Sequence, residues 1–277
     1  MRLRIAHEIV ATFDQPCTGA VRKLRMTPRT YDGQYVGAWR IDVDRDCRLD
    51  RVFDAYGNVV HNFSVAGPIS SLSIVATGEV EVDDTAGILP ATARERLPSG
   101  LFRRSTPVTE PDPAIRDLAD RCRAAGGETV LECCHLLMSM LHAEMTHRDA
   151  AANAAIEPTC RPAAEVLASG EGDAADVAHL FVAASLALGA PARFVSGYLR
   201  RGDKRDAGQA AHAWAETFVD GLGWVGFDAP NDTCPTDAYV RVATSLDKSG
   251  ACFVRGADQG PVDAEVVCRA MITQADL

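Results

Sequence analysis

The sequence of 277 residues lacks the features that mark several specialised classes of protein. It has no apolar run of about 20 residues, so no membrane-spanning helix is expected. The formal net charge is -10, whereas sequence-independent nucleic-acid binding needs a basic surface and an anionic membrane repels an acidic one. We therefore expect neither a nucleic-acid nor a membrane partner.

The sequence also lacks a disulfide framework and a recognisable metal motif. Its nine cysteines are an odd number without any CxxC pair, at positions 17, 47, 122, 133, 134, 160, 234, 252 and 268. The one close cluster, Cys133-Cys134-His135, lies in an apolar helical segment, where adjacent side chains diverge by about 100°. We interpret these thiols as core residues. Asp42, Asp44, Asp46 and Asp50 lack the glycine and terminal glutamate of an EF-hand and are interpreted as a solvated turn. No metal or cofactor is expected.

The first part of the chain has the pattern of a β-rich module. Residues 2–10, 36–43 and 72–82 alternate apolar and polar residues, and turn residues such as Asp32-Gly33 separate them. Because the first residues read as a strand rather than as a signal peptide, we expect a cytoplasmic location. The pattern predicts a β-sandwich-like module over residues 1–105, with a proline-rich linker over about 87–113.

The period of the apolar residues changes after Pro113. Helices are predicted over 114–124, 129–145, 162–168 and 176–188, and strands over 192–199, 211–219 and 224–228. Helices followed by a sheet favour an α+β domain over residues 106–277.

Two of the predicted strands carry a histidine and an aspartate. His212 and Trp214 are two residues apart and should point to the same side of their strand. The turn Asp220-Gly-Leu-Gly predicts a hairpin whose second strand ends at Asp228, so the pairing should bring His212 and Asp228 together. An aspartate beside a histidine is the arrangement that orients an imidazole for catalysis, although such a pair is more often structural.

A third segment, Gly172-Asp-Ala174-Ala-Asp176-Val-Ala-His179, gives that pair a context. Glycines in the turn before it should deliver position 174 to the N-terminus of a helix. Free N–H groups and the helix dipole would stabilise a thiolate there, but the residue is alanine.

These three segments resemble the Cys, His and Asp boxes of the transglutaminase-like superfamily, whose first box reads Gly-x-Cys-x-Asp-x-Ala-His. The stretch Leu188–Leu199 and the segment Tyr239-Val-Arg-Val-Ala are also similar to the family's sequence. Ile5-Ala-His7, residues 24–29, Gln34 and residues 54–58 resemble the β module that precedes the core in bacterial members. The resemblance covers nearly the whole chain and implies a papain/transglutaminase-like core of helices packed on an antiparallel sheet.

The resemblance also implies roles for individual residues. Position 174 would hold the nucleophile and its N–H would donate to the oxyanion, His212 would be the general base and acid, and Asp228 would orient the imidazole. Substrate-lining roles are expected for Trp214, Trp224, Asp176, His179 and Tyr198, although each of them is also explained by structure alone. Cys160 and Cys234 do not lie where a substitute nucleophile is needed.

With a cysteine at position 174, the resemblance implies a cysteine-dependent amide, peptide or isopeptide hydrolase acting through an acyl thioester. The chain as written is expected to be inactive. A deliberate Cys-to-Ala replacement and a natural pseudoenzyme both explain Ala174, and the retained His212 and Asp228 favour the first. The alternatives are a non-catalytic peptide-binding module, a scaffold, and an amine acyltransferase that cross-links proteins. The partner expected is a peptide or amide substrate, and a homo-oligomer is left open.

Overall fold

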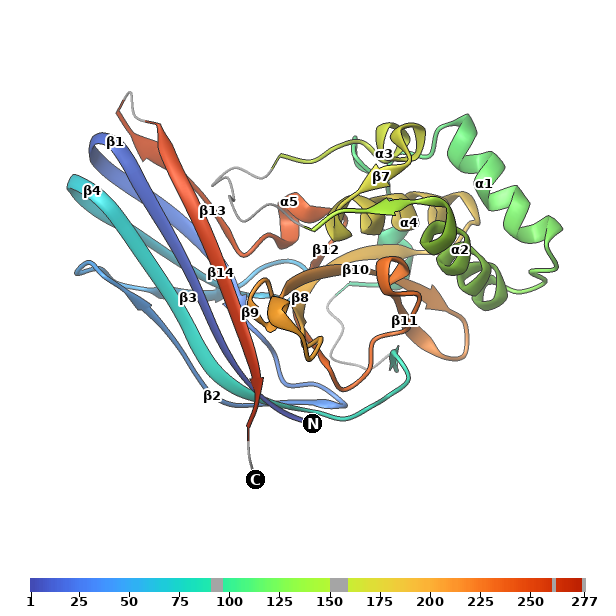
Figure 1. Ribbon diagram of the computed structural model, residues 1–277, viewed down its shortest axis with the longest axis horizontal. Coiled ribbons are helices and arrows are strands. Elements are labelled where there is room, and N and C mark those ends of the chain that lie inside the picture. The colour runs from blue at the N-terminus through green and yellow to red at the C-terminus, as the bar shows by residue number, and fades with distance from the viewer. Residues whose placement is uncertain (91–96, 150–158, 261–262, 276–277) are drawn as a thin grey trace.

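The computed structural model describes residues 1–90, 97–149, 159–260 and 263–275. Its larger sheet is built mainly from two very long antiparallel strands, β1 (Arg2–Thr27) and β4 (Val59–Val82), which stand at the left of Figure 1. The predicted strand over 2–10 is the beginning of β1, and residues such as Leu3, Ile5 and Ile9 are buried at alternate positions, as a half-buried strand requires.

Five further strands complete this sheet, in the order β2-β4-β1-β14-β9 with β13 beside β1 and β3 beside β4. They are β2 (Gln34–Val43), β3 (Asp50–Phe53), β9 (Ala207–Gly208), β13 (Val254–Gln259) and β14 (Ala264–Gln274). The first half of β1 pairs with β14 and the second half with β13, with register shifts between Thr12 and Gly19. Apolar residues of both halves share one core, so the sheet folds on itself and the predicted sandwich-like module is confirmed.

The second sheet is antiparallel and has the order β12-β8-β10-β11-β5. Its strands are β5 (Ile88–Leu89), β8 (Ala192–Leu199), β10 (Ala211–Val219), β11 (Gly223–Phe227) and β12 (Tyr239–Ser245). Hydrophobic side chains of α1 (Pro113–Ala124), α2 (Val130–Glu144), α3 (Ala163–Ser169) and α4 (Ala174–Ala187) pack against it in one core. This is the α+β arrangement of helices on an antiparallel sheet that the sequence predicts (Figure 1).

Short elements connect these layers. They are α5 (Lys248–Ala251), the parallel pair β6 (Thr146–His147) and β7 (Glu171–Gly172), and the 3₁₀ helices η1 (Ser99–Arg103), η2 (Lys204–Asp206) and η3 (Ala229–Asn231). The predicted helix starts have visible causes: Asp112 caps α1 ahead of Pro113, and Thr129 and Glu132 form a capping box on α2. Part of the predicted linker falls outside the described residues.

Strand pairing crosses the expected boundary near residue 105 in both directions. β13 and β14 come from the second part of the chain but pair with β1, and β5 from the linker pairs with β11. The division into 1–105 and 106–277 stays a prediction, and the C-terminal strands belong to the sheet of the N-terminal module. In the described part of the chain, no helix has the length and apolar character to span a membrane.

Two buried amide side chains join the sheets at β12, which is an edge strand. Asn58 donates to the Thr244 carbonyl at 2.8 Å and accepts from the Thr244 N–H at 2.9 Å. Gln34 makes the same pair of bonds with the backbone of Arg241, at 3.0 and 2.9 Å. Each amide thus replaces a neighbouring strand, because it supplies the donor and the acceptor that an edge would otherwise leave unpaired.

Candidate active site

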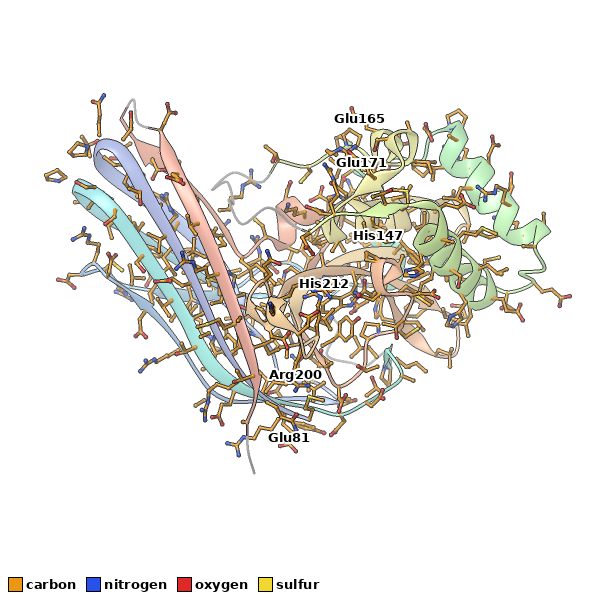
Figure 2. All side chains as sticks on the ribbon, viewed as in Figure 1. Glu81, His147, Glu165, Glu171, Arg200 and His212 are labelled. Atoms are coloured by element: carbon orange, nitrogen blue, oxygen red, sulfur yellow. The ribbon has the colours of Figure 1, made fainter. Side chains whose placement is uncertain are left out.

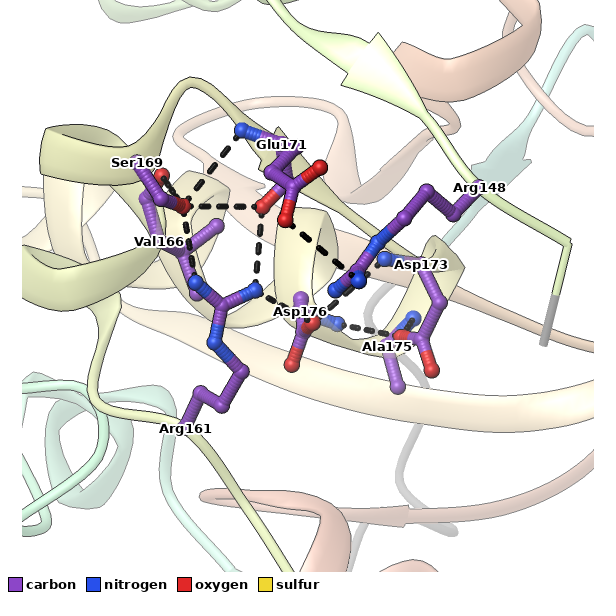
Figure 3. Close-up of polar contacts among 8 residues, drawn as sticks. All are labelled: Arg148, Arg161, Val166, Ser169, Glu171, Asp173, Ala175 and Asp176. Atoms are coloured by element: carbon purple, nitrogen blue, oxygen red, sulfur yellow. Dashed lines mark hydrogen bonds and ion pairs between the residues drawn. The ribbon is translucent and has the colours of Figure 1, made fainter. Parts of the chain in front are cut away.

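Position 174 is the first residue of α4, as the sequence predicts. The N-cap residue Asp173 accepts hydrogen bonds from the N–H groups of Ala175 and Asp176, both at 2.9 Å (Figure 3). The N–H of Ala174 is one of the helix's first donors, which have no intrahelical acceptor. It is therefore available to stabilise negative charge placed beside the Ala174 methyl group.

The turn before α4 explains the glycine and the aspartate of the first box. Gly170 ends α3 in the left-handed conformation, with φ +64°. A Cβ on Gly172 would lie 2.8 Å from the Cβ of Asp176, so only glycine fits beside the capping box. Arg161 holds the same turn from outside, reaching Ser169 at 2.7 Å, the Glu171 carbonyl at 3.0 Å and Asp176 at 3.3 Å (Figure 3).

His212 and Asp228 meet as the sequence predicts. The His212 Nε2 lies 2.7 Å from the Asp228 Oδ2, and both side chains are buried. The hairpin register differs from direct opposition: Ala215 pairs with Phe227, and Asp228 follows the end of β11 rather than facing His212 in the ladder. The His212 and Asp228 side chains span the remaining distance between the two backbone positions.

Asp228 receives three hydrogen bonds on one oxygen. His212, Asn231 and Tyr239 each donate to Oδ2 at 2.7 Å. Burial alone would raise the pKa of Asp228, but the charge of His212 and these three bonds outweigh it and hold the pKa below its usual range. Burial and the charge of Asp228 raise the pKa of Tyr239, which keeps its hydroxyl protonated as a donor. The carboxylate is therefore fixed in its charged form.

This arrangement sets the orientation of the imidazole. If Nε2 donates to the carboxylate, Nδ1 carries the lone pair and is the basic atom. The Arg201 Nη2 lies 3.2 Å from Nδ1 and donates to it. The nitrogen that would take a proton from a nucleophile is thus engaged by a guanidinium.

One pocket joins these groups. Ala174 and His212 both line it, together with His147, Arg201 and Asn231 (His147 and His212 are labelled in Figure 2). The pocket has a volume of about 180 Å³. Cys268 and Ala270 of β14 form part of its wall, so the sheet of the N-terminal module completes the site.

Two of the residues expected to line substrate, Asp176 and His179, have structural partners in the protein. Asp176 closes the capping box and pairs with Arg161, and burial together with the charge of Asp173 raises its pKa. His179 is buried and accepts the Lys248 N–H at 2.9 Å on Nε2, and burial lowers its pKa to about 4. Neither side chain lines the pocket that contains Ala174.

The three expected aromatic residues differ in their positions. The Trp214 ring stacks with the His212 ring at a centroid distance of 6.4 Å, so it packs beside the site. The Tyr198 hydroxyl lies 3.0 Å from the Nδ1 of buried His7, between the two sheets. Trp224 is buried under the Arg193 guanidinium, 3.7 Å from its ring. None of Trp214, Tyr198 and Trp224 lines the pocket that contains Ala174, and their substrate-lining roles stay predictions.

Sequence reasoning gave no role to Arg201, Asn231, Tyr239 or His147. Asn231 and Tyr239 stand in segments that carry the family resemblance, which was the available signal for them. Arg201 follows β8 in a polar loop, where no motif distinguishes it from its charged neighbours. Only its contact with His212 in the structure identifies Arg201 as part of the site.

The thiols offer no substitute nucleophile. All nine cysteines are free, and Cys268 is the one that lines the pocket. Burial raises the pKa of Cys268 to about 11, so it stays protonated. Cys133 and Cys134 are buried in α2, as expected of core thiols. Among the described residues, no three His, Cys, Asp or Glu side chains are grouped to hold a metal ion.

Comparison with known proteins places this geometry in a family. Residues 116–229 match the model of the transglutaminase-like superfamily, and residues 3–81 match that of the bacterial transglutaminase-like N-terminal region. An uncharacterized protein of Mycobacterium leprae is 26% identical over 96% of this chain and 97% of its own length. One of Mycobacterium tuberculosis is 28% identical over 92% of this chain and 87% of its own length.

A solved structure shows the same fold over the whole chain. It is that of a proposed cysteine protease from Cytophaga hutchinsonii, which superposes with a TM-score of 0.72 at 17% identity and covers 100% of this chain and 92% of its own. The fold and both matched regions agree with the boxes around positions 174, 212 and 228. Residues 116–229 thus belong to the transglutaminase-like superfamily, and residues 3–81 form the bacterial transglutaminase-like N-terminal region.

Proposed function

We propose that this site is built for cysteine-dependent acyl transfer from an amide or peptide, and that Ala174 replaces the nucleophile. The supporting observation is that position 174, at the start of α4, shares a pocket with a histidine whose far nitrogen is 2.7 Å from a buried aspartate. A base, an orienting carboxylate and a helix N-terminus are the groups that activate a thiol. Alanine keeps the Cβ atom of a cysteine and lacks its sulfur, so the nucleophile is missing.

The chemistry would run through a thioester once a cysteine stands at position 174. The Nδ1 of His212 takes the thiol proton, and the sulfur bonds to the acyl carbon. The backbone N–H of residue 174 donates to the carbonyl oxygen as it becomes negatively charged. The C–N bond then breaks as the imidazolium gives its proton to the leaving amine. Water, deprotonated by the same imidazole, attacks the thioester and restores the thiol. Asp228 stays charged and stabilises the imidazolium throughout.

We propose hydrolysis rather than amine transfer as the second half of the reaction. The fold neighbour is described as a proposed protease, and the family comprises cysteine-dependent hydrolases and acyltransferases. Cross-linking remains the alternative, and adding a competing amine to the reaction distinguishes the two. We also propose that the chain acts in the cytoplasm, since nine free thiols fit a reducing compartment.

The direct test is to introduce the thiol. Ala174→Cys, incubated with peptides, γ-glutamyl amides and isopeptides, should give turnover and an acyl-enzyme adduct detectable by mass spectrometry. Turnover should disappear in Ala174→Cys/His212→Ala. Ala175→Cys is the matched control, because its thiol sits one residue along α4 beside Ala178 and Phe194.

The outcome also decides how Ala174 arose. Turnover together with rapid, selective alkylation of the new thiol would support an inactivated enzyme and favour a deliberate Cys-to-Ala replacement. A folded Ala174→Cys variant that alkylates no faster than Ala175→Cys and cleaves nothing would contradict the enzyme proposal.

A second function, a non-catalytic binding module, is favoured by one observation. Arg201 donates to the Nδ1 of His212, the atom that the catalytic reaction needs free. In a pseudoenzyme this contact would be permanent, and the pocket would bind a peptide or amide without reacting. Peptide binding by Ala174→Cys without turnover would support the module.

A further inference from the structure

The pocket around Ala174 carries positive charge in an otherwise acidic protein. The net charge of the chain is -10, but the pocket lining contains three arginines and one aspartate, namely Arg148, Arg201, Arg205 and Asp149. The overall charge would favour a basic or neutral substrate, whereas the local charge favours an anion. Local charge decides binding at contact distance, because exposed charges farther away than about 10 Å are screened by salt.

Two of these arginines are neutralised by neighbouring carboxylates. Arg205 contacts Asp203 at 2.6 Å and Asp149 at 3.8 Å, and Arg148 lies 3.4 Å from Glu171. Arg201 differs from both. Within the described ranges, no carboxylate lies within 4.0 Å of its guanidinium, and its buried Nε has no hydrogen-bond partner.

The loop holds Arg201 in place without neutralising it. The carboxylate of Asp206 accepts hydrogen bonds from the backbone N–H groups of Arg201 and Gly202, at 2.7 and 2.6 Å. It therefore binds the main chain of Arg201 and not the guanidinium. The guanidinium makes two contacts, with the Gln209 carbonyl and the His212 Nδ1, both at 3.2 Å. Burial lowers the pKa of Arg201, as expected for a cation removed from water without a paired anion.

We infer that Arg201 is the receptor for a carboxylate on the substrate, so that the site selects acyl donors whose acyl group bears a carboxylate close to the scissile amide. This inference deepens the proposed function and rests on it. The guanidinium has donors left for a carboxylate, and Arg–carboxylate pairs are commonly bidentate. Because Arg201 touches His212, a carboxylate bound to it would lie within a few bonds of the reacting carbon.

The same contact connects binding to catalysis. A guanidinium that turns toward a substrate carboxylate leaves the Nδ1 of His212 able to accept a proton. Substrates with the carboxylate would therefore release the base that substrates without it leave engaged. This explains how a catalytic histidine can be held by an arginine in the free protein.

The test uses the Ala174 protein as it stands, so that it measures binding without turnover. The probes are the four- and five-carbon monoamides succinamate and glutaramate, each compared with its neutral diamide, succinamide or glutaramide. Binding is followed by NMR titration at about 0.15 M salt, where exposed charges farther away than about 8 Å are screened. We expect the monoamides to bind at least tenfold more tightly than the diamides, and Arg201→Gln to abolish that preference.

Two further variants distinguish an effect of the Arg201 guanidinium from an effect of positive charge in general. Lys204→Gln removes the same charge from an exposed position in the same loop and should change the preference less than twofold. Arg201→Lys should recover only part of it, since an ammonium cannot bind bidentately. Thermal melting of each variant shows whether the fold is retained. Equal binding of monoamide and diamide, or a preference that survives in folded Arg201→Gln, would overturn the inference.

The inference and the proposed function fail in different ways. A carboxylate preference in the Ala174 protein with no turnover by Ala174→Cys would retain the anion site and reject the enzyme. Turnover of neutral amides by Ala174→Cys that is unaffected by Arg201→Gln would retain the enzyme and reject the anion site.

Discussion

Strand β10 carries two buried acid–base clusters that differ in one respect. Glu216 is bonded on both oxygens, to Arg193 at 2.6 Å and to Arg241 at 2.7 and 3.1 Å. Four residues earlier, His212 binds Asp228 on one nitrogen and presents the other to the pocket. We call the first cluster closed, because both carboxylate oxygens are bonded within it, and the second open, because one nitrogen of its histidine faces the pocket.

The difference shows how similar groups serve structure or chemistry. In the closed cluster, burial would raise the pKa of Glu216, but the charges and hydrogen bonds of Arg241 and Arg193 lower it and fix the carboxylate. Its atoms are committed to joining β8, β10 and β12. In the open cluster, Asp228 is equally fixed, but the Nδ1 of the imidazole that it holds faces the pocket, where it contacts the Arg201 guanidinium at 3.2 Å. The proposed chemistry requires that this Nδ1 be released from Arg201 to take a proton, whereas the atoms of the closed cluster are never released.

Breaking the open cluster should have the largest effect, on rate. In an Ala174→Cys background, Asp228→Asn should lower kcat by about 10³- to 10⁴-fold, because an amide favours the wrong imidazole tautomer. Steady-state kinetics with the best substrate from the panel would measure this, and thermal melting would show that the fold is retained. A rate within tenfold of the Ala174→Cys parent would mean that Asp228 does not orient the histidine.

Breaking the closed cluster should cost stability instead. Glu216→Gln leaves the buried Arg193 and the partly buried Arg241 with a neutral partner and should reduce the free energy of unfolding by about 3 kcal/mol, measured in urea. Glu79→Gln is the matched control, because Glu79 also bridges two arginines, Arg2 and Arg4, but in an exposed position. Its loss should be much smaller. Similar losses for the two variants would show that burial does not set the difference.

A pH-dependent effect should come from His179, a buried histidine on the helix of position 174. Its pKa of about 4 lies below the usual value of 6.5, so the unfolded chain binds more protons between these pH values. Stability should therefore fall as the pH drops from 6.5 to 4, with this histidine contributing up to about 1.4 kcal/mol per pH unit.

His179→Gln should flatten that slope, because the amide oxygen can still accept the Lys248 N–H and does not titrate. Urea unfolding at several pH values between 4 and 6.5 measures it. An unchanged slope would place the acid sensitivity elsewhere, for example at buried His7, whose pKa burial lowers to about 3.

The sequence determined the local features of this protein by itself. The period of the apolar residues placed α1 to α4 and the strands β8, β10 and β11, because this signal acts within a few residues of chain. Box spacing placed Ala174 at a helix start and brought His212 to Asp228, since a hairpin fixes which side chains can meet.

Tertiary structure decided what depends on segments far apart in the chain. Pairing of β14 with β1 put Cys268 and Ala270 into the pocket wall, and Asn58 met β12 across 186 positions. It also buried Tyr198 against His7 and brought Arg201 to the Nδ1 of His212. No local pattern encodes such contacts, because they depend on how two sheets pack together.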